Sequence, residues 1–233
     1  MVFNKLLAFS IFNQHGVYIV NNLQKTGGVA ALLESIIYVS AFVFFGAFWN
    51  FPADADSAQK FAFLAENQNV LSIVNLIMYV LFGVLLAILV LALHERLKRN
   101  ASILSQIASV FGVVWVGLVI ASGMIANIGL AAALELSTKD PEQAMTVWRA
   151  IYSVVEGLGG GNEVVGGLWV LLLSFAALKG NELPKTLNYF GFFVGIVGVF
   201  TIYPADVLTE VFGISQIVWF SWLGVAMLRG RKS

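Results

Sequence analysis

Long runs of apolar residues, separated by short polar segments, dominate the pattern of this chain. A membrane-spanning helix needs about 20 predominantly apolar residues, because each residue adds only about 1.5 Å along the helix axis. Six runs approach or exceed that length, and the pattern predicts an all-α, polytopic transmembrane bundle of six spans. The expected spans are Gly28–Trp49, Val70–Leu93, Leu104–Ile128, Leu158–Leu178, Leu187–Tyr203 and Val207–Leu228.

The first 27 residues interrupt this pattern, because Asn4, Lys5 and the polar run 13–15 divide a weakly apolar segment. We therefore expect residues 1–27 to form an interfacial N-terminal helix, and residues 28–233 to form a single six-helix transmembrane domain. A short re-entrant or docking helix against the bundle is the alternative for the N-terminal segment.

A strong helix start precedes the fourth span. Asp140 is a capping residue, Pro141 suits the first helical position, and Glu142 lies in the first turn. One continuous helix from Pro141 to Leu178 would be about 57 Å long, which exceeds the thickness of a bilayer. Its first half must therefore project outside the membrane, lie on the surface, or bend at the glycines that follow Glu156.

Composition and charge support the membrane assignment and suggest an orientation. Of all residues, 59% are hydrophobic and only 11% are charged. The formal net charge is zero, but ten of the 13 Lys and Arg residues fall on one side of the membrane when the N-terminus is placed in the cytoplasm. Basic residues favour the cytoplasmic side, so both termini are expected there. The outer loops hold the other three, Lys60, Lys139 and Arg149.

Several kinds of chemistry are excluded by the residues present. The chain has no cysteine, which removes disulfides and thiol catalysis, and its two histidines, His15 and His94, lie outside the spans. This argues against a bis-histidine haem within the membrane. A covalent retinal is also argued against, because no span near the C-terminus has a central Lys. The cofactor stays unknown, and the expected partner is the lipid bilayer and not nucleic acid.

The most informative segment is the run Glu156-Gly-Leu-Gly-Gly-Gly-Asn162-Glu163 at the mouth of the fourth span. Ionisable groups in a span usually face the bundle interior or water, and they are functional-site candidates by default. In a continuous helix, one stripe would hold Arg149, Tyr152, Glu156, Gly160, Glu163 and Gly167. The two glycines of this stripe would allow a neighbouring helix to approach closely.

Glu163 is the central candidate of this stripe, and we expect it to face inward. It either titrates or binds a cation, or it is structural and hydrogen-bonds a nearby polar side chain. Three amides share its expected depth in the outer third of the spans, namely Asn75, Asn127 and Gln216. These amides are expected to line an outward-facing polar cleft with Glu163.

A second membrane carboxyl, Glu34, enters from the inner side, and about 12 Å of depth would separate it from Glu163. Glu34 is either a relay or pocket acid, or a structural group near the inner headgroups. Two acids at different depths are the pattern expected of a proton or cation path.

Small residues also favour close helix packing in the fifth span. Gly191, Gly195 and Gly198 give one smooth helix face. The contact is expected either inside the monomer or with a second copy or another membrane protein.

Short motifs in the chain resemble a bacterial family of six-span integral membrane proteins that is catalogued only as a domain of unknown function. The resemblance covers residues 24–230 and is carried by Gln24-Lys25-Thr26-Gly27 and by Asn181-Glu182-Leu183-Pro184-Lys185, followed by Gly191 and Gly195. It implies a location in the bacterial cytoplasmic membrane, with multiple passes, and it implies no activity.

Three functions are compatible with these features. The first is handling of an ion, a proton or a small solute in the outward-facing cleft. The second is a non-catalytic subunit or assembly partner of a membrane protein complex. The third is a lipid-acting enzyme with Glu156 and Glu163 as acid and base, which is disfavoured because their backbones would be about 10 Å apart without an accompanying nucleophile or metal ligands.

Overall fold

Every described element of the computed structural model is helical, which confirms the all-α class. The structure describes residues 2–160 and 163–229, and the side chains of residues 22–159 and 163–229. The α-helices are α1 (Val2–Val43), α2 (Ser57–Glu66), α3 (Gln68–Asn75), α4 (Phe82–Leu97), α5 (Ser102–Ser137), α6 (Pro141–Val155), α7 (Val164–Gly180), α8 (Lys185–Phe200) and α9 (Asp206–Leu228). Short π-helical segments follow α1, α3 and α6 at Phe44–Phe48, Leu76–Leu81 and Glu156–Gly160.

Five helical segments of the described chain are long and apolar enough to cross a membrane. They are Asn22–Phe48, Gln68–Leu97, Ser102–Ser137, Pro141–Gly180 and Asp206–Leu228, and each overlaps one predicted span. The remaining predicted span corresponds to α8, whose 16 residues reach only about 24 Å. The chain is thus an all-helical protein with several helices able to span a membrane.

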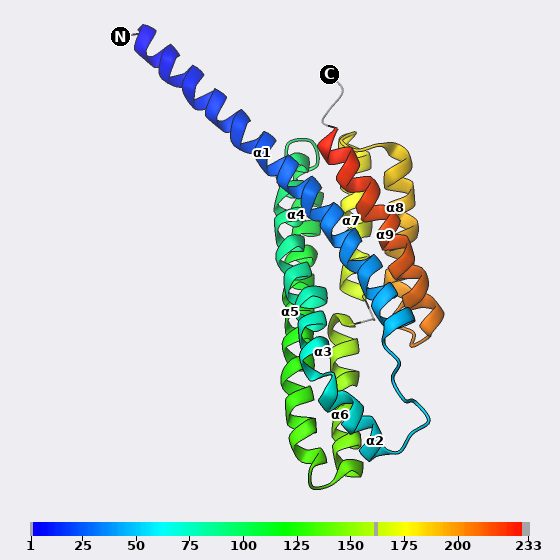
Figure 1. Ribbon diagram of the computed structural model, residues 1–233. Helices are drawn as coiled ribbons and strands as arrows, with labels where there is room; N and C mark the ends of the chain where they lie inside the picture. Colours follow the sequence, from blue (N-terminus) through cyan, green and yellow to red (C-terminus); the bar gives the residue numbers. More distant parts are fainter. Residues whose placement is uncertain (1, 161–162, 230–233) are drawn as a thin grey trace.

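Two parts of the molecule can be distinguished in Figure 1. The bundle consists of α1, α4, α7, α8, α9 and the first part of α5, and these helices share one large apolar core. The extension consists of α2, α3, α6 and the last part of α5, which lie mostly beyond the turn between α8 and α9 (Figure 1). The extension has a small core of its own, made by Phe61, Leu64, Leu71, Leu130, Ala133, Ala144 and Met145. Of the three arrangements expected for the long fourth helix, the structure combines projection beyond the bundle with a break at the glycines.

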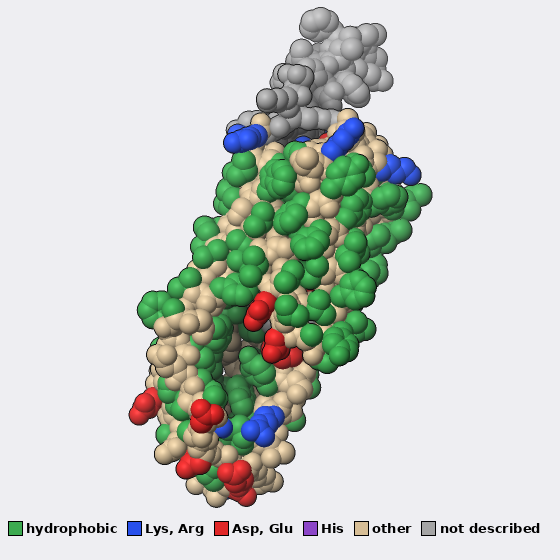
Figure 2. Space-filling model, turned by 90° about the vertical axis from the view of Figure 1, so that its right-hand side faces the viewer, with side chains coloured by type: hydrophobic (Ala, Val, Ile, Leu, Met, Phe, Trp, Pro, Cys, Tyr) green, Lys and Arg blue, Asp and Glu red, His purple; other side chains and the backbone are tan. Residues whose placement is uncertain are grey.

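Charged and apolar side chains are segregated along the long axis. Exposed apolar side chains cover the bundle, and basic side chains gather at one end, as Figure 2 shows. This basic end holds the α4–α5 and α7–α8 connections and the C-terminal end of α9 (Figure 1). Acidic side chains lie midway along the molecule and at the opposite end, on the extension, where basic side chains are also visible (Figure 2). An apolar belt between polar ends is the surface of a protein that crosses a bilayer.

The structure joins the expected N-terminal segment to the first span, because α1 is one helix of 42 residues. Two consecutive glycines, which weaken a helix, lie within it. Tertiary packing holds the helix together there: an added Cβ at Gly27 would meet Ala92, and one at Gly28 would meet Gly224 and Leu228. An interfacial position for the first residues of α1 stays a prediction.

A polar clamp closes the basic end of the bundle. Arg96 donates to the backbone oxygen of Glu182 at 2.6 Å, and its Nε lies 3.6 Å from the Glu182 carboxylate. Asn100 donates to the same carboxylate at 2.6 Å. Both side chains of the ion pair are nearly buried, at 12% and 5% exposure. The clamp therefore ties the α4–α5 connection to the α7–α8 connection.

We expect Glu182→Ala to lower the free energy of unfolding by roughly 3 kcal/mol, because it leaves the nearly buried Arg96 without this carboxylate. Denaturant unfolding in detergent, followed by circular dichroism, measures the change. Glu95→Ala is the matched control, because its pair with Lys98 is more exposed and should contribute less than about 1 kcal/mol. Equal losses in the two variants would contradict the clamp.

Candidate functional site around Glu163

The glycine-rich segment breaks the fourth span into two helices. Asp140 caps α6 by accepting from the Gln143 N–H at 2.9 Å, as its position before Pro141 predicted. The helix ends in a π-helical turn, where Gly159 has φ 138° and ψ 24°, a conformation that side-chain-bearing residues rarely adopt. α7 then starts anew at Val164. The expected single stripe from Arg149 to Gly167 is therefore wrong, because it required an unbroken helix.

This break places Glu163 immediately before the first turn of α7. Its side chain is only 8% exposed, which confirms that it faces inward. The Glu163 carboxylate accepts a hydrogen bond from the indole N–H of Trp115, on α5. The backbone N–H of Glu163 donates to the Thr201 hydroxyl at 2.8 Å, and that hydroxyl donates to the Gly198 oxygen at 2.7 Å. Glu163 is thus fixed by α5 on one side and by the end of α8 on the other.

Three features of this position act on the charge of Glu163. Burial disfavours the charged carboxylate, whereas the Trp115 donor and the positive end of the α7 dipole stabilise it. No Lys, Arg or His lines either described cavity that Glu163 adjoins. A carboxyl balanced between opposing influences, without a fixed cationic partner beside it, is suited to exchange a proton or a cation with water.

A closed ring of aromatic side chains supports the Trp115 donor. The ring centroid of Trp115 lies 5.6 Å from that of Trp169, and the Trp169 centroid lies 5.6 Å from that of Trp219. The ring continues through Phe220 and Phe82 and returns to Trp115, with centroid distances of 5.3, 6.0 and 5.8 Å. All five side chains are almost completely buried. Aromatic contacts of this kind hold side chains in defined orientations, so the direction of the Trp115 N–H is fixed.

Glu163 lies between two cavities. One, of about 60 Å³, is lined by Tyr38, Tyr79, Gly159 and Glu163, among others. The other, of about 210 Å³, is lined by Trp115, Glu163 and residues of the glycine-rich segment, and it reaches the exposed Ile202. The carboxyl can therefore be approached from two directions.

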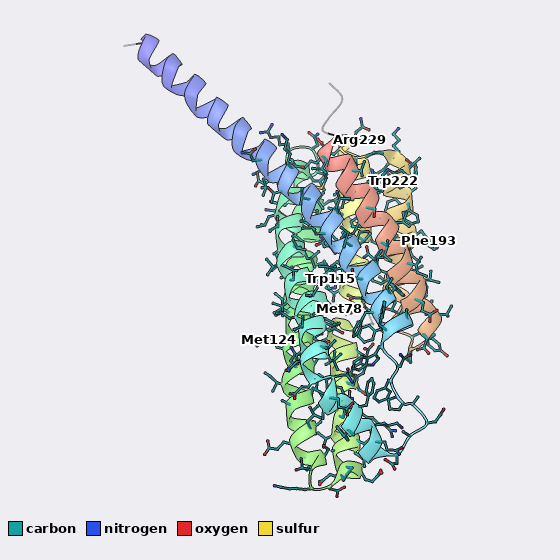
Figure 3. All side chains as sticks on the ribbon, viewed as in Figure 1. Met78, Trp115, Met124, Phe193, Trp222 and Arg229 are labelled. Carbon is teal, nitrogen blue, oxygen red and sulfur yellow. The ribbon has the colours of Figure 1, made fainter. Side chains whose placement is uncertain are left out.

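The largest of the described cavities, about 420 Å³, lies between the bundle and the extension. Six aromatic side chains line it, namely Phe45, Trp49, Phe51, Tyr79, Trp148 and Tyr152. It shares Met78 and Tyr79 with the 60 Å³ cavity beside Glu163, so these two residues separate the two spaces. Figure 3 shows Met78 and Trp115 toward the middle of the molecule, whereas Met124 lies at its edge.

Two of the three predicted amides pair with each other, and the third lies apart. Asn75 lines the large cavity and donates to Asn127 at 2.9 Å, and Asn127 donates to the Ser72 backbone oxygen at 3.2 Å. Gln216 lies apart from them on α9 and is fully buried. Among the four residues expected to share one polar cleft, only Asn75 lines the large cavity and only Glu163 lines the smaller two. The large cavity is consequently more aromatic than the sequence suggested.

The other predicted candidates lie around this region. Tyr152 lines the large cavity and packs against Trp148 with a centroid distance of 5.8 Å. Glu156 is partly buried at the start of the π-helical turn, and Arg149 is exposed on α6. Asn162 lies outside the described residues. Glu34, on α1, is fully buried. Among the described residues, no group of three or more acidic or histidine side chains could hold a metal ion.

Sequence reasoning did not identify Trp115, Tyr38, Tyr79 or Thr201 as neighbours of Glu163. A signal existed for Trp115, because an indole N–H buried in a core needs an acceptor, and the spans offer few carboxylates. The phenols gave no comparable signal, since tyrosines are also common at membrane interfaces. Comparison of the chain with protein-family models, curated proteins and solved structures found no match.

Proposed function

We propose that this integral membrane protein binds a small solute in the 420 Å³ cavity, and that Glu163 handles a proton or cation at its inner side. One observation supports this most strongly. A buried carboxyl without a basic neighbour in its cavities lines a small cavity that shares Met78 and Tyr79 with a ligand-sized space. Ligand sites of proteins usually have such mostly apolar walls with a few polar groups, in cavities of roughly 300–1,000 Å³.

The lining defines the chemistry of the solute. Six aromatic rings favour an apolar body, while Asn75 and the hydroxyls of Tyr79 and Tyr152 offer hydrogen bonds to one polar end. The Asn75 amide is already oriented by its bond to Asn127. A small solute with an aromatic or branched apolar body and one polar group fits this lining, whereas a sugar would leave most of its hydroxyls without partners.

The proposed membrane arrangement has six spans, with α8 as the short fifth span. The basic end faces the cytoplasm together with both termini, because Lys and Arg favour that side. The extension and the large cavity then lie toward the outside. The resemblance to the bacterial six-span family supports placing the protein in the bacterial cytoplasmic membrane.

A partner role through the α8 glycines receives less support from the packing. An added Cβ at Gly191 would meet Ser174 of α7 and Trp219 of α9, and one at Gly198 would meet Gly167 and Phe212. This face is therefore occupied within the chain. Contact with a second copy or another membrane protein stays a prediction, and it would use a different surface.

Introduced cysteines test whether the large cavity is open to water and binds solutes. The chain has no cysteine of its own, so each variant carries a single thiol. In sealed, right-side-out membrane vesicles, we expect the thiol of Ala126→Cys, on the cavity wall, to react with a membrane-impermeant thiol reagent. Ala133→Cys is the control, because Ala133 is fully buried on the same helix in the core of the extension. If the thiols of both variants are equally protected from the reagent, the large cavity is not open to water.

Solute binding is then read as protection of the Ala126→Cys thiol. The probes are indole, tetraethylammonium and benzoate, which share an apolar body and differ in charge. We expect at least one of them to slow labelling several-fold, whereas glucose should have no effect. If none protects the thiol while the reagent still enters, the solute proposal fails.

Filling the cavity should abolish binding of the protecting probe. We expect Ala126→Phe to reduce affinity at least tenfold, because the new ring occupies space beside Asn75 and Tyr79. Equilibrium dialysis of the radiolabelled probe with purified protein measures this change. Ala132→Phe is the matched control, since Ala132 is exposed on the same helix. Unchanged affinity in a folded Ala126→Phe variant would place the solute elsewhere.

A further inference from the structure

Two polar side chains in the centre of the bundle have no hydrogen-bond partner in the described part of the chain. These are Glu34, whose two carboxyl oxygens lack a partner, and Gln216, whose side-chain amide nitrogen and oxygen lack one. Both residues have 0% exposure. Buried polar groups are nearly always hydrogen-bonded, because an unsatisfied group loses its hydration without compensation. These two residues therefore call for a functional explanation.

The contact between α1 and α9 brings Glu34 and Gln216 to the same level. Ser35 donates to the Ile217 backbone oxygen at 3.0 Å. Glu34 and Gln216 are the sequence neighbours of these two residues, one on each helix. The register of the two helices thus places both unsatisfied side chains at one depth in the bundle.

Helix spacing places Tyr38 near both of them. On α1 it follows Glu34 by four residues, so the two share one helix face. On α9, Gly213, Gln216 and Phe220 share one face by the same spacing rule. Tyr38 packs against two residues of that face, with its ring centroid 6.2 Å from that of Phe220 and its ring next to Gly213. Gln216 lies between them on the face that meets Tyr38.

Tyr38 also reaches the Glu163 site. It lines the 60 Å³ cavity together with Glu163 and Tyr79. The titratable groups that act on Tyr38 electrostatically are Glu163, Glu34 and Tyr79. None of these groups is basic. At about 60 Å³, the cavity has room for water.

We propose that Glu34 is a second proton-binding carboxyl and that Tyr38, with Gln216 and water in the small cavity, connects it to Glu163. The proposal rests on the role of Glu163 in the proposed function. In each transfer the Glu163 carboxyl gives its proton, through cavity water, to the Tyr38 hydroxyl. The Tyr38 hydroxyl gives its own proton, through water, to the Glu34 carboxylate, whose oxygens have no direct hydrogen-bond partner in the described part of the chain. One O–H bond breaks and one forms at Tyr38, so the phenol is unchanged and the negative charge moves to Glu163.

Gln216 has a defined part in this arrangement. Its amide N–H can donate to the ionised Glu34 carboxylate, and its amide oxygen can accept from the protonated carboxyl. It therefore serves both protonation states without titrating itself. The pathway would carry a proton from the large outer cavity, past Tyr79 and Glu163, into the centre of the membrane domain. Proton movement of this kind is what would couple solute binding to the membrane pH gradient.

Infrared difference spectroscopy of the purified protein in lipid nanodiscs, recorded between acidic and alkaline pH, tests the proposal. We expect two carboxylic C=O bands from buried groups, of which Glu34→Gln removes one and Glu163→Gln the other. Glu210→Gln is the control, because Glu210 is exposed on α9 and should alter neither band. If Glu34→Gln leaves the difference spectrum unchanged, Glu34 does not exchange protons and the proposal is overturned.

Tyr38→Phe tests the connection and retains the ring packing against Phe82 and Phe220. We expect both bands to remain, but the hydrogen–deuterium exchange of the Glu34 band should slow at least tenfold. Tyr189→Phe is the control, since Tyr189 is exposed on α8. Unchanged exchange in Tyr38→Phe would overturn the path through the phenol.

The solute-protection measurement separates this inference from the proposed function. Glu34→Gln, combined with Ala126→Cys, should still show probe protection at one fixed pH. Loss of the Glu34 band with retained protection supports both proposals. Absence of protection in the otherwise wild-type Ala126→Cys variant contradicts solute binding, whatever the infrared bands show.

Discussion

Gly167→Ala is expected to destabilise the protein by about 3 kcal/mol and to separate α7 from α8. An added Cβ would lie 2.6 Å from the Val199 nitrogen, 2.7 Å from the Gly198 carbonyl carbon and 2.8 Å from the Gly195 oxygen. These are backbone atoms, so no side-chain rotation can make room for the methyl group. Forced overpacking of a core typically costs about 1–3 kcal/mol. Here the movement should also weaken the Thr201 bond to the Glu163 N–H.

Thermal unfolding in detergent, followed by circular dichroism, measures this loss. Gly117→Ala is the matched control, because Gly117 is in the middle of α5 and an added Cβ there meets no atom within 4 Å. The control should be neutral or slightly stabilising, since Ala is the better helix former. If both variants unfold at the same temperature, α7 and α8 do not approach as closely as the structure describes.

The sequence anticipated this contact only in part. The spacing of Gly191, Gly195 and Gly198 predicted a smooth face on α8, and Gly167 was expected to permit close approach of a neighbouring helix. Both expectations are confirmed by the contacts of these glycines. The pairing of the two faces was not predictable, because small-residue motifs indicate that a helix packs closely but not against which partner.

The positions of the five helices that are long and apolar enough to cross a membrane were predictable for a simple physical reason. A bilayer requires about 20 apolar residues in a row, and such runs are visible in any sequence. The break of the fourth span was less accessible, because helical periodicity carries the stripe from Arg149 to Gly167 without interruption. In the structure, Gly159 has a positive φ that interrupts the helix, and α7 begins again directly after Glu163. The glycines of the sequence indicated where the helix breaks, but not the geometry of the break.

The burial of Glu163 was predicted correctly, but the composition of its surroundings was not. Amides at the same depth suggested a polar cleft, whereas the residues that approach the carboxyl are Trp115 and the phenols of Tyr38 and Tyr79. Depth along the membrane normal can be counted from the sequence. The rotation of each helix about its axis depends on tertiary packing, and this rotation decides which side chains at a given depth meet.

Glu163→Gln should have the largest effect on function, and it should leave the fold intact. Glutamine has the shape of glutamate, and its amide oxygen can still accept the Trp115 N–H. The variant loses the negative charge and the ability to bind a proton. We expect the free energy of unfolding to change by less than about 1.5 kcal/mol, because a buried charge is removed along with a charge-assisted hydrogen bond.

Trp115 provides a direct optical readout of the carboxyl. Protonation of Glu163 removes a full negative charge from the acceptor of the indole N–H, so the Trp115 contribution to the emission spectrum should change as the pH falls through the titration of Glu163. Glu163→Gln should abolish this pH-dependent component. Trp115→Phe identifies the component, because it retains an aromatic ring in the cluster and removes the N–H donor.

Glu163→Gln also decides whether the charge of Glu163 affects the binding of the solute. With wild-type protein, affinity for the protecting probe should depend on pH, because Glu163 lines the small cavity that shares Met78 and Tyr79 with the large cavity. With Glu163→Gln, affinity should be the same at every pH. Exposed Glu142→Gln is the control and should retain the wild-type profile. If Glu163→Gln also retains that profile, both in emission and in probe affinity, another group titrates. The buried carboxylate is then structural, held by Trp115 for packing alone, and the proposed handling of a proton or cation loses its central residue.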